Sequence, residues 1–129
     1  MRRADFLLLV MLVLVFGSAG CAPSSNSATV VEDYYKALVA KDRGRFVNLI
    51  CADWEAAAML EFDSFGAVEA ELDGVSCEKS GTDGDNTLVT CKGSLSVTYR
   101  GEDNRLLSLE DNTYRVIKEG GEWRMCGYE

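Results

Sequence analysis

Residues 88–100, with the sequence LVTCKGSLSVTYR, alternate between apolar and polar side chains and decide the fold class. The odd positions from Val89 to Tyr99 are apolar apart from Gly93, and the even positions from Thr90 onward carry Thr, Lys, Ser and Arg. Successive side chains of a strand point to opposite faces. The pattern therefore predicts a strand with one buried face and one face in water, which is typical of antiparallel sheets.

A second strand is predicted before this one, over residues 68–79, with the turn-forming sequence GTDGDN at 81–86 between the two. The apolar positions of residues 68–79 change from even to odd numbers partway along the segment. One extra residue in a strand restores such a phase, so we expect a bulge at Asp73–Gly74.

Two further strands are predicted after residues 88–100, over residues 105–118 and 123–128. The turn GEDN at 101–104 leads into the first of them, and EGGE at 119–122 closes a hairpin between the two, with Gly-Gly at its centre. The predicted sheet therefore has four antiparallel strands joined by hairpins.

The residues before the sheet have the spacing of helices. Apolar residues recur at i, i+3, i+4 and i+7 from Val31 to Leu38, which is one face of a helix. Thr29 and Glu32 have the form of a capping box, so we expect this helix to begin at Thr29 and to end near Lys41.

Two shorter helices follow in the prediction. Asp42 can cap one that carries Phe46, and Asp53 can cap an alanine-rich one from Trp54 to Glu61. Helices followed by antiparallel strands make an α+β domain. We predict N-terminal helices packed in the concave face of a bent four-stranded sheet, because that arrangement buries both apolar faces.

Two segments resemble the nuclear-transport-factor-2-like superfamily, which has a cone-shaped fold. VVEDYYKALVAKDRGRFVNLICADW, residues 30–54, is similar to its opening pair of helices, and YRVIKEGGEWRMCGYE, residues 114–129, is similar to its closing hairpin. The resemblance covers about residues 28–128 and implies the fold of a single domain over residues 29–129. It implies no activity, since one fold serves many functions.

The first residues have the pattern of an export signal. Met1-Arg2-Arg3 is positively charged, and the apolar run from Phe6 to Phe16 is too short to span a bilayer, which needs about 20 residues. Residues 17–21, GSAGC, resemble the lipobox of bacterial lipoproteins. The resemblance implies that residues 1–20 are removed and that Cys21 carries a lipid. An ordinary secretory signal is the alternative.

After that removal, residues 21–28 form a lipidated cysteine and a small, polar tether. The mature chain is strongly acidic, because the whole chain has a net charge of −8 and residues 1–20 hold two Arg and one Asp. Nucleic acid binding requires a basic surface, so we exclude it. The predicted location is the outer face of a bacterial membrane, at the cell surface or in the periplasm, held there by the lipid.

Four cysteines remain besides Cys21, and an even number in an oxidising compartment predicts two disulfides. A hairpin centred on Gly84 places Cys77 directly opposite Cys91, which leaves Cys51 for Cys126. The chain has no histidine and no C-x₂-C pair, so we predict no metal site and no cofactor.

Five residues are candidates for lining a pocket inside the cone. Tyr34 and Tyr35 lie on the helix expected to line it, and Trp54 can close its mouth. Tyr99 lies on the apolar face of the central strand. The fifth is Glu110, whose place depends on how residues 105–118 pair.

In one register, residues whose numbers sum to 205 pair. Tyr114 then lies opposite Cys91, and Glu110 points inward, where burial raises the pKa of a carboxyl group. In the favoured alternative, a bulge near Asp111 turns Leu107 and Leu109 inward and leaves Glu110 in water.

The chain lacks histidine, the commonest acid–base residue, so we assign no catalytic residue and the prediction leans away from an enzyme. The predicted role is a membrane-anchored module of the cell envelope that binds a small apolar ligand or a partner protein. One alternative is an isomerase or hydrolyase that uses Glu110 and a tyrosine. The other is a structural module that forms a homodimer through the outer face of its sheet, with Leu107 and Leu109 exposed there.

Overall fold

The computed structural model describes residues 26–129. The predicted signal peptide, Cys21 and most of the predicted tether lie outside the described residues. The helices are α1 (Ser27–Val39), α2 (Arg43–Phe46) and α3 (Glu55–Ser64), with 3₁₀ turns η1 (Val47–Leu49), η2 (Ala52–Trp54), η3 (Phe65–Ala67) and η4 (Leu109–Asp111). The strands are β1 (Val68–Asp83), β2 (Asn86–Tyr99), β3 (Glu102–Ser108), β4 (Thr113–Glu119) and β5 (Glu122–Tyr128).

The predicted α+β class is confirmed, but the predicted number of strands is wrong. The antiparallel sheet has the order β1-β2-β4-β5, and a fifth strand, β3, also pairs with β2. The expected third strand, 105–118, is divided into β3 and β4 by η4. This turn is begun by Ser108, whose side chain accepts a hydrogen bond from the Glu110 backbone N–H at 3.3 Å.

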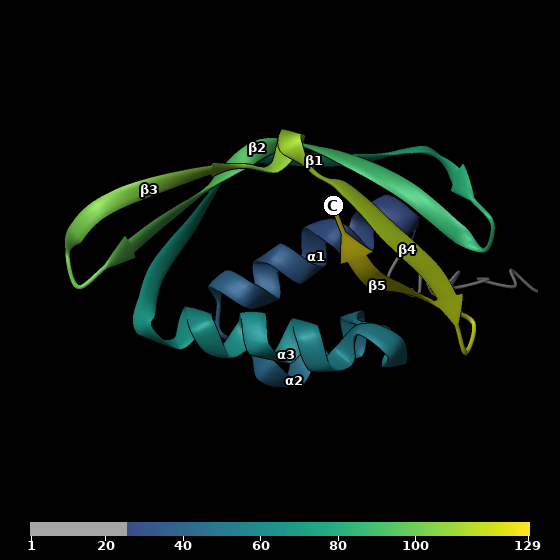
Figure 1. Ribbon diagram of the computed structural model, residues 1–129, viewed down its shortest axis with the longest axis horizontal. Coiled ribbons are helices and arrows are strands. Elements are labelled where there is room, and N and C mark those ends of the chain that lie inside the picture. Colours follow the sequence, from purple (N-terminus) through teal and green to yellow (C-terminus); the bar gives the residue numbers. More distant parts are fainter. Residues whose placement is uncertain (1–25) are drawn as a thin grey trace, which may run out of the picture.

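The long strand β2 holds the sheet together because it serves three neighbours. Along one edge it pairs with β1. Along the other edge, its first half pairs with β4 and its second half with β3. Figure 1 shows the resulting bent sheet arching over α1 and α3, with β3 at one end of the arch and β4 and β5 at the other.

The predicted bulge in β1 is confirmed. The pairing of β1 with β2 shifts between Asp73 and Ser76, and Gly93 of β2 lies against this shift with φ +101°. A Cβ atom at Gly93 would lie 2.6 Å from the carbonyl oxygens of Asp73 and Gly74. This position therefore requires glycine both for its backbone conformation and for lack of space.

Of the two registers weighed for residues 105–118, the one in which paired residue numbers sum to 205 is wrong. Tyr114 pairs with Val89 instead of Cys91, and Leu107 pairs with Leu95. The difference arises because η4 takes residues out of the ladder. Tyr114 nevertheless keeps its buried side, because the shift from Cys91 to Val89 is an even number of residues.

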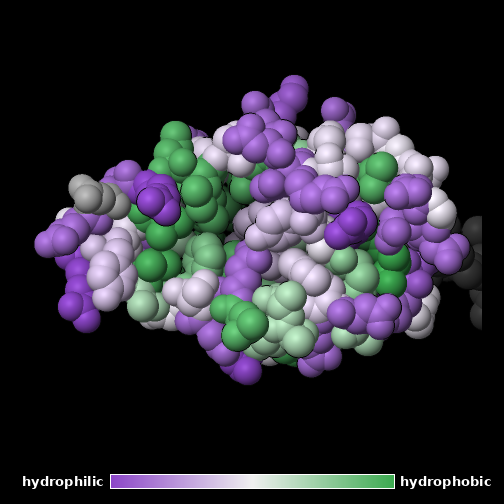
Figure 2. Space-filling view, viewed as in Figure 1, coloured by the Kyte–Doolittle hydropathy of each residue, from purple (hydrophilic) through white to green (hydrophobic). Residues whose placement is uncertain are grey.

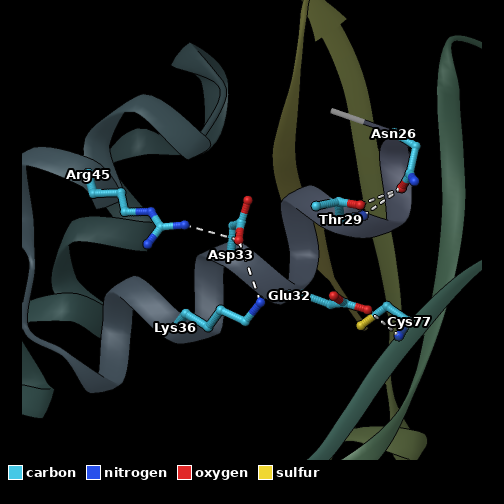
Figure 3. A network of polar contacts seen from close by, with 7 residues as sticks. All are labelled: Asn26, Thr29, Glu32, Asp33, Lys36, Arg45 and Cys77. Atoms are coloured by element: carbon cyan, nitrogen blue, oxygen red, sulfur yellow. Dashed lines mark hydrogen bonds and ion pairs between the residues drawn. The ribbon is translucent and has the colours of Figure 1, made fainter. Parts of the chain in front are cut away.

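The start of α1 differs from the prediction. Asn26 is the N-cap, and its side chain accepts a hydrogen bond from the Thr29 backbone N–H at 2.8 Å. The predicted capping box is therefore wrong, and Ser27 and Ala28, expected in the tether, belong to the helix. Glu32 instead accepts a hydrogen bond from the backbone N–H of Cys77 at 2.9 Å, which ties α1 to β1 (Figure 3).

The caps of the shorter helices follow the prediction in one case. Asp42 caps α2 by accepting a hydrogen bond from the Arg45 backbone N–H at 3.1 Å. Asp53 lies inside η2 instead of at a cap, and α3 begins at Glu55.

The core lies between α1 and the concave face of the sheet. Its largest fully buried side chains are Tyr34, Tyr114, Phe46, Leu38, Met125, Val31, Val89, Val116 and Cys51. Residues from α1, β2, β4 and β5 meet there, which positions α1 as the central rod of the domain (Figure 1).

Both disulfides have the predicted pairing, Cys51–Cys126 and Cys77–Cys91. Cys51 reaches Cys126 at the edge of the sheet. There Ile50 forms a parallel bridge with Met125, and the Cys51 N–H donates to the Met125 carbonyl at 2.9 Å. No helix within residues 26–129 is long and apolar enough to cross a membrane.

Candidate binding cleft

A cleft of about 440 Å³ opens between α3 and the β3 end of the sheet. Its walls are mostly apolar and come from η3, β2, β3 and η4: Phe65, Leu95, Leu106, Leu107 and Leu109. In Figure 2 apolar residues gather at this end of the molecule, beside a hollow near its centre. Ligand sites in proteins have volumes of about 300–1,000 Å³ and combine apolar walls with a few polar groups.

The polar part of the cleft is built around Glu61. This residue lies on α3, and its carboxylate accepts a hydrogen bond from the hydroxyl of Tyr128, on β5, at 2.9 Å. Both residues line the cleft. The contact joins the covering helix to the last strand and fixes the carboxylate at the cleft.

A second chain of hydrogen bonds runs behind the wall. Tyr35, on α1, lines the cleft and donates its hydroxyl proton to the Tyr114 hydroxyl oxygen at 3.1 Å. Tyr114 donates in turn to the Leu109 carbonyl at 3.2 Å. The hydroxyl protons of Tyr35, Tyr114 and Tyr128 therefore all go to acceptors inside the protein.

Tyr34 is different from these tyrosines. It is fully buried, and its hydroxyl has no hydrogen-bond partner among residues 26–129. Glu61 is close enough to influence it electrostatically. An unpaired buried hydroxyl costs free energy, but Tyr34 is not among the residues that line the cleft, so this cost belongs to the core.

The environment shifts the protonation of this cluster. Burial raises the pKa of Glu61 above its ordinary value, and the hydrogen bond from Tyr128 offsets part of that rise. Burial is also the main reason why the pKa values of Tyr34, Tyr35, Tyr114 and Tyr128 are raised, so these hydroxyls stay neutral.

The predicted pocket residues are only partly brought together. Tyr35 lines the cleft. Tyr34 and Trp54 lie in the aromatic layer behind it, with their ring centres 5.6 Å apart. Tyr99 is 47% exposed, lies farther along β2, and has the Arg100 guanidinium 5.2 Å from its ring centre.

Glu110 lies outside the cleft and is exposed. It borders a second depression, of about 390 Å³, together with Thr90 and Lys92 of the outer face, whose neighbours Val89 and Cys91 are buried. The inward register for Glu110 is therefore wrong. In the alternative register, Leu109 is buried as predicted and Leu107 faces the cleft while remaining 42% exposed.

Sequence reasoning missed Glu61 and Tyr128. A signal for Glu61 was present, because Ala58, Glu61, Phe62 and Phe65 have the spacing i, i+3, i+4 and i+7 of one helix face. A carboxylate within an otherwise apolar stripe marks a polar group directed toward the core side. Ending the predicted helix at Glu61 concealed this stripe.

The cleft does not have the composition of a metal site. Within the described part of the chain, no three Cys, Asp or Glu residues lie close enough to hold a metal ion.

Comparison with known proteins shows a likeness of fold. No protein-family model and no curated protein matches the chain. The solution structure of a SEC-C motif containing protein from Rhodopseudomonas palustris is similar, with a TM-score of 0.53 and 14% sequence identity. The match covers 81% of this chain and 80% of that chain. At this identity the likeness extends to the fold alone.

Proposed function

We propose that this chain is a lipid-anchored protein of the bacterial envelope that binds a small ligand in the cleft between α3 and β3. The observation that carries the proposal is the combination of apolar walls with one fixed carboxylate, Glu61, inside a cleft of about 440 Å³. A cleft with convergent polar groups is the usual form of a ligand site.

The anchored location is part of the same proposal. It rests on the lipobox-like residues 17–21, with Cys21 as the lipid attachment site. Two disulfides within one small domain fit an oxidising compartment.

We also propose that the domain is related to the nuclear-transport-factor-2-like superfamily. Support comes from α1 and α3 lying beneath the concave side of a strongly bent antiparallel sheet (Figure 1). Ligands of such a fold would enter where the cleft opens, between α3 and β3.

Mass spectrometry of the full chain, purified from membranes in detergent, tests this proposal. Under native conditions we expect an additional small mass, which disappears on denaturation. The denatured mass should show a lipid on the chain that begins at Cys21. A native protein with no captured mass, from several growth conditions, would count against the ligand; an unlipidated chain would count against the anchor.

Glu61 favours a second candidate, an acid–base enzyme, because its carboxyl group has a raised pKa and faces a cleft. It replaces the enzyme hypothesis that used Glu110, since that residue lies on the outer face. Chemical conversion of the captured ligand by the wild type, but not by Glu61→Gln, would establish this candidate. Unchanged ligand after prolonged incubation would exclude it.

The structural dimer loses its support. The two leucines that would have marked an apolar outer face lie elsewhere, because Leu109 is buried and Leu107 lines the cleft.

A further inference from the structure

We infer that the ligand of the cleft is an organic cation, an ammonium group carried on an apolar body. This inference rests on the proposed binding function and specifies the chemical class of the ligand. Three features of the cleft point to it: its charge, its hydrogen-bonding groups and its aromatic rings.

The charged side chains that line the cleft all have one sign. Glu61 and Asp111 are carboxylates, and no Lys or Arg is among the cleft's described lining residues. Cations do line other depressions of the sheet: Lys92 in the one that Glu110 borders, and Arg105, accompanied by Glu102, in another. An anionic ligand would meet uncompensated repulsion in the cleft, whereas a cation would be attracted.

Among residues 26–129, Glu61 also has no positively charged partner. The ion pairs within residues 26–129 involve other carboxylates, and the polar contact of Glu61 is with the neutral Tyr128 hydroxyl. Burial makes an unpaired carboxylate costly, as the raised pKa of Glu61 indicates. A bound ammonium would relieve that cost.

Four residues of the cleft lining offer acceptors to a ligand, namely Tyr35, Tyr128, Glu61 and Asp111, while Ser108 and Asn112 add the donors of a hydroxyl and an amide. Tyr128 donates to Glu61, and Tyr35 donates to Tyr114, so both cleft tyrosines have used their protons. Lone pairs remain on their hydroxyl oxygens and on the carboxylates of Glu61 and Asp111. A ligand that supplies several N–H donors, as an ammonium does, matches this set.

The aromatic rings and the walls select the rest of the ligand. Tyr35 and Tyr128 are aromatic residues of the cleft lining, which also contains Glu61, and cations bind favourably over aromatic rings. The leucines and Phe65 provide an apolar wall for the body of the molecule. A strongly hydrated, compact cation such as a metal ion would leave this wall unused.

Three probes with one skeleton test the inference: tryptamine, tryptophol and indole-3-propionate, which end in an ammonium, a hydroxyl and a carboxylate. The full chain in maltoside detergent is titrated with each by calorimetry at 150 mM NaCl, with empty micelles as the blank. We expect tryptamine to bind at least 10-fold more tightly than either of the others.

Variants localise the effect. Glu61→Gln should weaken tryptamine binding at least 10-fold and leave tryptophol binding nearly unchanged. Glu110→Gln removes the same charge from the outer face and should change the binding of neither tryptamine nor tryptophol. Because both variants are measured in the same detergent, partition of the probes into micelles affects them equally. Asp111→Asn, an exposed substitution at the cleft, should weaken tryptamine binding about 3-fold and serves if Glu61→Gln fails to fold.

Equal binding of all three probes, or tightest binding of the carboxylate, would overturn the cation and leave the binding cleft in place. Equal weakening of tryptamine by Glu61→Gln and Glu110→Gln would also overturn it, since diffuse surface charge would then explain the attraction. If none of the probes binds, the inference fails, while the mass measurement on the purified protein still decides whether the cleft captures a ligand.

Discussion

The two ends of the molecule are built differently. At the β4–β5 end, the Cys51–Cys126 disulfide and the Ile50–Met125 bridge fasten the helical segment to the sheet, and Met125 and Val116 are fully buried. At the β3 end, Leu106 is 70% exposed, Leu107 is 42% exposed and a cleft separates the sheet from α3. The comparison teaches that stability is concentrated at one end, which leaves the other end free to carry a site.

Removing the Cys51–Cys126 disulfide, at the β4–β5 end, should have the largest effect on stability. The Cys51→Ala/Cys126→Ala double variant opens a loop with a sequence separation of 75 residues and should lower the free energy of unfolding by about 4.5 kcal/mol. The matched Cys77→Ala/Cys91→Ala variant, with a separation of 14, should lose about 3 kcal/mol. Urea denaturation measures both variants, and the opposite order would show that the Cys51–Cys126 bridge is not the one that contributes more to stability.

The centre of the arch offers the next test. Gly93→Ala should cost about 3 kcal/mol, because the new methyl group meets backbone oxygens 2.6 Å away and the backbone has a positive φ. Gly81→Ala is the control, since nothing lies within 4 Å of its added carbon and its backbone is unrestricted. A loss as small as that of the control would mean that the bulge of β1 is absent.

Two leucines at the β3 end should differ in how much they contribute to stability. Leu109→Ala removes a side chain that is 2% exposed and should cost about 2.5 kcal/mol. Leu107→Ala should cost less than about 1 kcal/mol, because that side chain already contacts solvent in the cleft. Thermal or urea unfolding compares them, and equal losses would mean that Leu107 belongs to the core.

Two tyrosine hydroxyls should differ in their contribution to stability, because one makes a hydrogen bond and the other has no partner among the described residues. Tyr35→Phe loses a hydrogen bond to Tyr114 and should cost about 1 kcal/mol. Tyr34→Phe removes a hydroxyl without a partner among the described residues and should be neutral or slightly stabilising. Destabilisation by Tyr34→Phe as large as that by Tyr35→Phe would reveal a partner for Tyr34.

The smallest expected effect is the pH dependence of stability that Glu61 causes. Because the pKa of Glu61 is raised in the folded state above its ordinary value of 4.5, the folded state binds the proton more tightly than the unfolded chain. The associated stability is present below that value and is lost as pH rises through the folded pKa. Glu61→Gln should therefore be stabilising at pH 8 relative to the wild type, and the difference should vanish near pH 4.

Urea denaturation at a series of pH values measures this difference, with Glu110→Gln as the control for a lost surface charge. A Glu61→Gln effect that is the same at pH 4 and pH 8 would mean that the carboxyl group is not desolvated.

Much of the fold follows from local patterns. The alternation of residues 88–100 and the glycines at the turns predict β1, β2 and β5, and the cysteine positions fix the register at Cys77 and Cys91. Residues 105–118 were harder, because a single hydrogen bond from the Glu110 N–H to Ser108 divides one expected strand into two. The position of this turn cannot be read from the alternation of apolar and polar residues.

The site was less predictable for a similar reason. Tyr35 could be found, since it lies on the apolar face of a regular helix. Glu61 and Tyr128 are 67 residues apart in sequence and meet only because α3 folds beneath the sheet. Glu110 attracted attention because an unbroken strand would have pointed it inward.

The most direct test of a binding cleft between α3 and the β3 end of the sheet is native mass spectrometry of two leucine variants. Leu107→Arg places a long charged side chain at the cleft wall, and Leu60→Arg makes the same change on α3 at a position that is 74% exposed and outside the cleft. The binding function predicts a captured small mass in the wild type and in Leu60→Arg and its loss in Leu107→Arg. Retention of that mass by a folded Leu107→Arg variant would place the ligand elsewhere and contradict the proposed site.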